Sequence, residues 1–172
     1  MGIPTLISTA TASGAASVDI TSGIDSTYDE YMFVFTDIGP ATNQVEFSFQ
    51  VNAADQSGFN ETMTTSTYLA QQGEDAAGAA LGYEGGDDQA EGTSYQTICK
   101  QIGNGSDESC AGILHLFSPA STTYVTHFYA RIHGYEHSNY AEDVFTAGSI
   151  NITAAIDEIS FKFSSGNFDG VI

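Results

Sequence analysis

The amino-acid sequence predicts an all-β protein, folded as a two-sheet antiparallel sandwich. Its 172 residues include 18 glycines, few leucine, lysine or arginine residues, and many threonine, serine, tyrosine and phenylalanine residues. β-Branched and aromatic side chains fit pleated strands, whereas the common helix formers are scarce. Apolar and polar residues alternate with a period of two in several segments, and polar turns separate these segments. A chain of this length is expected to form a single domain over 1–172.

The expected strands follow one another along the whole chain. In the stretch "QVEFSFQV" every second residue is apolar, so Phe47 and Phe49 would face the core and Ser48 and Gln50 would face water. The same alternation in "EISFKFSS" places Phe161 inward. The full set of expected strands is 3–9, 15–20, 30–38, 44–52, 64–71, 94–102, 110–117, 123–133, 143–152 and 156–164.

Turn signals lie between these segments, among them "GPATN" at 39–43, "SPAS" at 118–121 and "SSGN" at 164–167. Short, regularly spaced strands of this kind favour a sandwich, with jelly-roll topology as the first choice and an Ig-like Greek key as the second. The sequence shows no repeat of 20 to 50 residues, which disfavours a propeller or a solenoid.

The stretch 71–94, "QQGEDAAGAALGYEGGDDQAEGTS", departs from the pattern because it is rich in glycine and acidic residues. We expect it to form a long acidic surface loop or a disordered excursion. Long loops on rigid β scaffolds are common recognition elements.

The net charge of the chain disfavours two classes of binding partner. It has 22 acidic and three basic residues, for a formal net charge of −19. Nucleic acid and anionic membrane surfaces attract clustered lysine and arginine, so neither is an expected partner. No apolar run reaches the roughly 18 residues of a membrane span. The first residues lack the basic and apolar regions of a signal peptide, so no standard secretion signal is expected.

The two cysteines give a local prediction. Asn104-Gly105 is a preferred pair for a type I′ hairpin turn, and a two-residue loop there would place Cys99 directly opposite Cys110. Opposed strand positions lie within disulfide reach. In a reducing cytoplasm both thiols would stay free, so the sequence leaves a disulfide and a thiol pair open.

Catalytic and metal-binding patterns are weak. His133 and His137 have a spacing that places two ligands together only in a helix, and a strand is expected there. The carboxylates of Asp87, Asp88 and Glu91 leave a Ca²⁺ site open, although the twelve-residue calcium loop is absent. No nucleophile elbow, Cys/His dyad or phosphate-binding glycine loop is present, so we expect no cofactor and no enzymatic activity.

Apolar residues at both chain ends are candidates for an assembly interface. They are Ile3, Leu6 and Ile7 in the first expected strand, and Val171 and Ile172 after the turn at 164–167. The last pair would begin a strand at an open sheet edge, and open edges invite a partner. We expect the sandwich to begin by about Ile3, which leaves no N-terminal arm.

Three stretches carry a resemblance to a known family: "LISTATASGAASVDITSGIDSTYDEYMFVFTDIGPAT", "CAGILHLFSPASTTYVTHFYA" and "IDEISFKFSSGNFDG". They are similar to the small β-sandwich virion structural proteins of tailed bacteriophages, particularly those of marine bacteria. The resemblance implies a capsid decoration or cement protein, assembled in the host cytoplasm. Such a protein would bind the major capsid protein or another virion protein as a homotrimer. The alternative that it implies is a tail fibre or receptor-binding domain that recognises host glycan or protein.

Overall fold

A computed structural model describes residues 3–76 and 78–172, and it confirms the all-β prediction. These residues form strands and no helix, so no helix among them could cross a membrane. Every strand pairing is antiparallel. In chain order the strands are β1 (Thr11–Ala15), β2 (Val18–Ile20), β3 (Glu30–Pro40), β4 (Val45–Ala53), β5 (Met63–Gly73), β6 (Ala80–Tyr83), β7 (Ala90–Gly92), β8 (Gln96–Ile102), β9 (Cys110–Phe117), β10 (Thr126–Glu136), β11 (Tyr140–Ile150), β12 (Ile156–Phe163) and β13 (Phe168–Val171).

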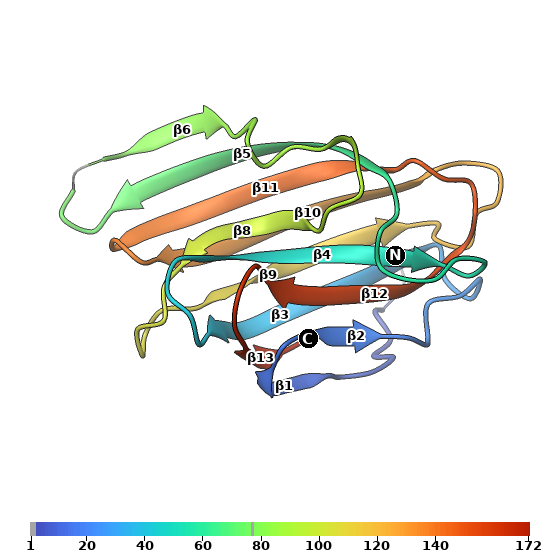
Figure 1. Cartoon of the computed structure of the whole chain (residues 1–172), viewed down its shortest axis with the longest axis horizontal. Helices are drawn as coiled ribbons and strands as arrows, with labels where there is room; N and C mark the ends of the chain where they lie inside the picture. Colours follow the sequence, from blue (N-terminus) through green and yellow to red (C-terminus); the bar gives the residue numbers. More distant parts are fainter. Residues whose placement is uncertain (1–2, 77) are drawn as a thin grey trace.

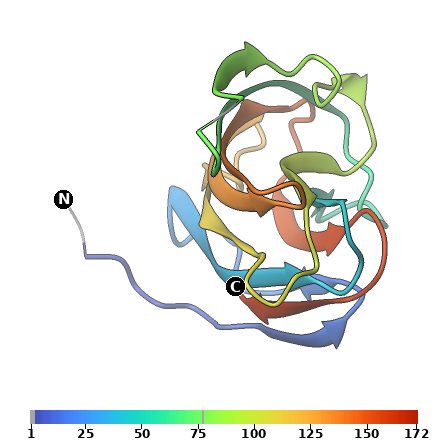
Figure 2. The same ribbon diagram turned by 90° about the vertical axis from the view of Figure 1, so that its left-hand side faces the viewer.

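The strands form one branched sheet that folds back on itself into two facing layers (Figures 1 and 2). The larger layer has the order β1-β13-β3-β9-β10-β11-β5, and both β6 and β7 pair with β5. The smaller layer has the order β8-β4-β12-β2. β10 joins the layers where Glu136 pairs with Ile102 of β8. The expected two sheets are therefore two layers of one nearly closed sheet.

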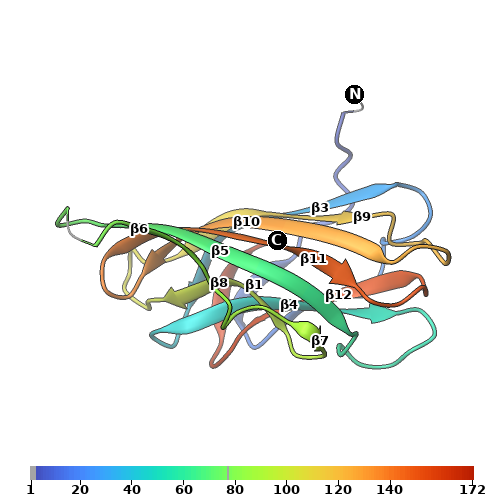
Figure 3. The same ribbon diagram turned by 90° about the horizontal axis from the view of Figure 1, so that it is seen from above.

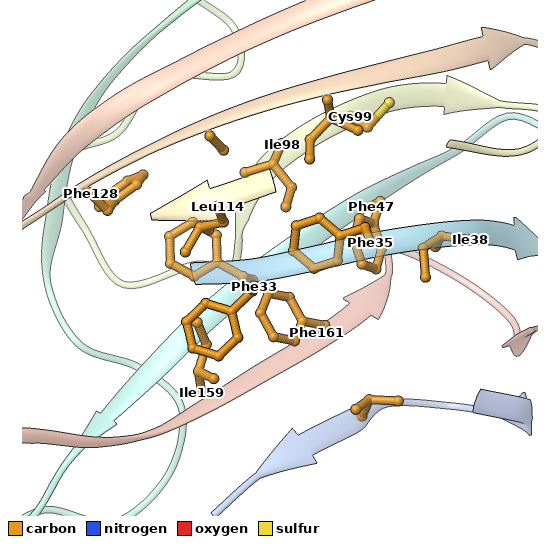
Figure 4. Packing of buried hydrophobic residues seen from close by; sticks show 14 of the residues in the cluster. Phe33, Phe35, Ile38, Phe47, Ile98, Cys99, Leu114, Phe128, Ile159 and Phe161 are labelled. Atoms are coloured by element: carbon orange, nitrogen blue, oxygen red, sulfur yellow. The ribbon is translucent and has the colours of Figure 1, made fainter. Parts of the chain in front are cut away.

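Phenylalanines from both layers make the core (Figure 4). Phe35 of β3 packs against Phe47 of β4 and Phe161 of β12, with ring centroids 5.3 and 5.1 Å apart and steep interplanar angles. Edge-to-face contacts of this kind add to the free energy gained by burying the rings. All three side chains are buried, as the period-two pattern predicts for Phe47 and Phe161.

The two chain ends differ from the prediction. Residues 3–9 form no strand, and the first strand begins at Thr11. The final strand, β13, lies between β1 and β3, and Ile172 exchanges backbone hydrogen bonds of 2.8 and 2.9 Å with Ala10. The open C-terminal edge that we expected is therefore covered by β1. This pairing joins segments more than 150 residues apart, which no local pattern reveals.

The stretch 71–94 is not the long loop that we expected. β5 continues to Gly73, and β6 and β7 both lie along β5. The Lys100 ammonium lies 2.8 Å from Glu84 and 3.0 Å from Asp87, which ties this acidic stretch to β8. Backbone pairing and a partly buried cation thus order a segment whose composition is typical of loops.

The polar face of β4 is also buried, contrary to the prediction. Ser48 and Gln50 are both buried, and the segments before β5 and between β7 and β8 cover Gln50. The Gln50 amide nitrogen donates hydrogen bonds of 3.0 Å to the backbone carbonyls of Glu61 and Ser94. Because these bonds satisfy the buried amide, the polar side chain holds the covering segments in place.

Candidate functional site

The outer surface of the larger layer carries a wide apolar row that crosses five strands. Val34 of β3 lies opposite Ile113 of β9, which lies opposite Arg131 of β10. Arg131 in turn lies opposite Phe145 of β11, and Phe145 opposite Tyr68 of β5. Side chains at directly opposed positions share one face of a sheet. The row is therefore continuous across the layer.

Stacking fixes one end of this row. The rings of Tyr68 and Phe145 are parallel within 7°, with centroids 4.7 Å apart. The Arg131 guanidinium lies 4.8 Å from the centroid of the Phe145 ring and donates a 2.7 Å hydrogen bond to the Asp143 carboxylate. A cation above an aromatic ring, held by a carboxylate, restrains both side chains. The row thus presents a preformed surface.

A second row runs beside the first. Met32 of β3, His115 of β9 and Tyr129 of β10 lie at opposed positions. The His115 and Tyr129 rings stack with centroids 4.6 Å apart, and His115 Nδ1 lies 2.5 Å from a Glu30 carboxylate oxygen. Met32 and Val34 are 45% and 49% exposed, although both are apolar. We call the two rows together the aromatic face; it consists of Met32, Val34, Tyr68, Ile113, His115, Tyr129, Arg131 and Phe145.

The aromatic face is nearly neutral, in contrast to the chain as a whole. Glu30 and Asp143 are the carboxylates beside the two rows, and they contact His115 and Arg131. The other exposed carboxylate on the described strands of the face is Asp37, which lies at the bulge towards the end of β3, beyond the rows. The complete chain carries a net charge of −19. Large exposed apolar patches on soluble proteins mark interaction surfaces. This face is the part of the larger layer best suited to contact another molecule.

An open groove lies at one end of the aromatic face. It has a volume of about 580 Å³ and is lined by Tyr28, Asp29, Phe117, Tyr124 and His127, among others. The Tyr124 ring is 76% exposed. Exposed aromatic rings beside hydroxyl, carboxylate and imidazole groups can stack on and hydrogen-bond to a polar ligand such as a sugar.

A buried carboxylate, that of Glu142, lies near the start of β11 and points into the protein. Glu142 is 3% exposed, and one of its oxygens has no hydrogen-bond partner. Burial and, to a smaller extent, the negative charge of Glu136 raise the pKa of Glu142 to about 7. Glu142 therefore changes its charge near neutral pH.

The carboxylates considered for Ca²⁺ are engaged elsewhere. Asp87 lies against Lys100, and Asp88 accepts a hydrogen bond from the Tyr83 hydroxyl. Within residues 3–76 and 78–172, no three His, Cys, Asp or Glu side chains converge as metal ligands. Asp87, Asp88 and Glu91 do not form the site that the sequence left open.

The cysteines meet in a way that the sequence did not predict. β8 and β9 are not paired as a hairpin, because β10 lies between them in the sheet. Cys99 and Cys110 are both buried and free, and they approach each other over Gly134 of β10. A hydrogen bond with Cys110, together with burial, raises the pKa of the Cys99 thiol. The thiol pair is thus part of the core.

The structure separates the predicted assembly residues. Ile3 and Leu6 are 93% and 82% exposed, and Ile7 is partly covered. Val171 lies in β13 and is 36% exposed, whereas Ile172 packs against the core. The sequence analysis did not identify the aromatic face. Its signal lies in "EYMFVF" at 30–35, where consecutive apolar residues occupy both faces of one strand.

Neither a family model, nor a curated protein, nor a solved structure matches the chain. A β-sandwich by itself is compatible with many functions. Function is therefore inferred from the surface and the site described above.

Proposed function

We propose that the protein is a non-enzymatic structural protein of a phage virion, a decoration or cement protein on the outer head surface. There it would stabilise the contacts between capsomers, with the major capsid protein or another virion protein as its partner. The observation that carries this proposal is the near-neutral aromatic face on a chain of net charge −19. A rigid apolar face with few free charges is suited to packing against protein.

The strand order supports a virion role. The order β1-β13-β3-β9 in one layer faces β2-β12-β4-β8 in the other. We interpret this as the order of an eight-stranded jelly roll, since the pairs β1–β2, β3–β4, β8–β9 and β12–β13 each cross between the layers. Jelly rolls recur in viral capsid proteins and in lectins. On this interpretation, β10, β11 and β5 are additions that widen one layer and complete the aromatic face.

The charge supports placement on the outside of a shell. A strongly acidic exterior is repelled by packaged DNA, because phosphate binding needs clustered basic side chains. Contacts through a neutral face can be weak individually and still hold many copies on a repeating lattice. A homotrimer on a symmetry axis is one arrangement of this kind.

Particles of the virus that encodes the chain provide the test. Gold-labelled antibody and quantitative mass spectrometry would give the position and the number of copies. Hundreds of copies over the head support decoration, whereas a few dozen or fewer at the tail refute it. In a binding assay with particles that lack the protein, Val34→Asp should abolish binding. The matched control Ser165→Asp, which adds the same charge to an exposed turn, should retain it.

The groove favours a second candidate function, receptor recognition by a tail protein. Its exposed tyrosines and neighbouring polar groups are suited to host glycans. Adsorption of the purified chain to host cells would support this candidate, and Tyr124→Ala should reduce it. Tyr83→Ala removes an equally exposed ring outside the groove and serves as the control. A decoration protein should not adsorb in either form.

A further inference from the structure

The segment 3–9 is an exposed arm (Figures 2 and 3). Among the described residues, the first backbone hydrogen bonds are those of Ala10 with Ile172. Ile7 lies against Gly23 and anchors the base of the arm. Beyond this anchor, Ile3 and Leu6 are 93% and 82% exposed, so nothing in the same chain covers them. Exposure of two large aliphatic side chains is unfavourable unless another surface covers them.

The arm and the aromatic face lie on the same side of the molecule. In Figures 2 and 3 the arm runs outward beyond β3 and β9, on the side away from the smaller layer. It points away from its own sandwich, so it does not lie on its own aromatic face. The arm of one copy can therefore reach a second copy. The aromatic face of that second copy is exposed to it.

Charge favours a second copy as this neighbour. Residues 1–18 contain no charged side chain, although the chain has 22 acidic residues. Both carboxylates on the aromatic face are paired. Two copies of net charge −19 repel each other wherever their free carboxylates meet. An uncharged arm lying on a neutral face avoids that repulsion.

The dimensions are compatible. The four residues beyond the Ile7 anchor, 3–6, reach roughly 13 Å when extended, and three neighbouring strands span about 10 Å at their usual spacing. This part of the arm is thus long enough to cross β3, β9 and β10 of the aromatic face.

We propose that residues 3–9 of one copy dock on the aromatic face of a second copy, with Ile3 and Leu6 as the apolar anchors. This inference deepens the proposed function and rests on it, because it names a second copy of the chain as a partner of that face. Covering one such aliphatic side chain changes an association constant by about tenfold to a hundredfold. Each contact is weak alone and is reinforced in a closed ring or on a lattice.

Sedimentation equilibrium of the purified full chain tests the proposal. We expect concentration-dependent association, and the double variant Ile3→Asp/Leu6→Asp should lower the association constant at least tenfold. Val34→Asp on the face should have a similar effect, while Ser165→Asp should leave association unchanged. A chain that stays monomeric up to about 1 mM, or arm and face variants that associate like the wild type, would overturn the proposal.

A photo-crosslinker at position 6 gives a second readout. Leu6→p-benzoylphenylalanine, mixed with isotopically labelled wild-type chain, should form crosslinks between copies to peptides of β3 or β9. Crosslinks to β2 or β6 instead would mean that the arm adds to a sheet edge, which contradicts docking on the face. Both experiments use the isolated chain, so a negative result leaves the counting of copies on particles unaffected.

Discussion

Glu142 makes the stability of this protein depend on pH in a direction that can be measured. Its side chain is buried on β11, and burial raises its pKa to about 7 from an ordinary value of 4.5. Between these two values the folded protein binds a proton that the unfolded chain has released. The free energy of unfolding therefore decreases as the pH rises from about 5 to above 7. The perturbation that isolates this effect is Glu142→Gln, which retains the shape and removes the charge.

The magnitude follows from the two pKa values. Each unit of difference between the folded and unfolded pKa is worth about 1.4 kcal/mol, so the ionised Glu142 would cost the folded state about 3 kcal/mol at pH 8. The pKa of about 7 already includes the attraction of Lys100. Relaxation of the protein and water penetration around the ionised group reduce the cost further, and we expect about 1 to 3 kcal/mol. At pH 5 both the glutamic acid and the glutamine are neutral. The two proteins should then be similarly stable.

Urea denaturation at pH 5, 6, 7 and 8 measures this difference. Glu142→Gln should be more stable than the wild type at pH 8, and the advantage should disappear towards pH 5. Asp55→Asn is the matched control, because it removes the same charge from an exposed turn and should show a much smaller dependence on pH. An advantage of Glu142→Gln that is equal at pH 5 and pH 8 would mean that ionisation of Glu142 does not destabilise the folded protein.

Three further predictions concern the core. Phe161→Ala should lower the free energy of unfolding by about 3 to 5 kcal/mol in urea denaturation, since its ring packs between both layers, and Phe161→Leu should cost less. Gly134→Ala should destabilise by about 1 to 3 kcal/mol, because the added Cβ would lie 2.5 Å from Ile102 Cδ1 and 2.6 Å from Cys99 Sγ; a Cys99→Ala background should recover only part of the loss, because the contact with Ile102 remains. Both thiols should resist alkylation in native buffer and react after denaturation, as followed by mass spectrometry.

The alternation of apolar and polar residues was sufficient to predict most strands. The segments 30–38, 110–117 and 156–164 correspond closely to β3, β9 and β12. A strand with one buried face has a period of two regardless of its partner, so a single sequence reveals it. The same pattern placed Phe47, Phe49 and Phe161 in the core, where the structure has them.

Strand partners were not predictable in the same way. Asn104-Gly105 is a strong local hairpin signal, yet β10 lies between β8 and β9. The pairing of β10 with β9 continues over eight consecutive residue pairs, and a pairing of that length outweighs the preference of one turn. The expected position of Cys99 opposite Cys110 failed for this reason, although Gly134 leaves room for the thiols to approach each other.

The candidate site was missed for a related reason. An outward apolar residue such as Met32 or Val34 looks like part of a core strand until the sheet order is known. Only the register across β3, β9, β10, β11 and β5 shows that these residues align with Tyr68 and Phe145 in one surface. The sequence did not predict the arm, because the residues 3–9 have a composition typical of a strand. In the structure no neighbouring strand pairs with them.

Charge and topology together restrict how this protein can assemble. With 22 acidic and three basic residues, most of the surface repels a second copy. Two of the three basic residues are engaged within the chain: Lys100 is paired with Glu84 and Asp87, and Lys162 lies over the Tyr95 ring. Arg131 is the third, and it lies on the aromatic face with Asp143. Attraction between opposite charges on two copies can therefore contribute little. The proposed contact between copies relies on surfaces without free charges, and the uncharged arm and the aromatic face are of that kind.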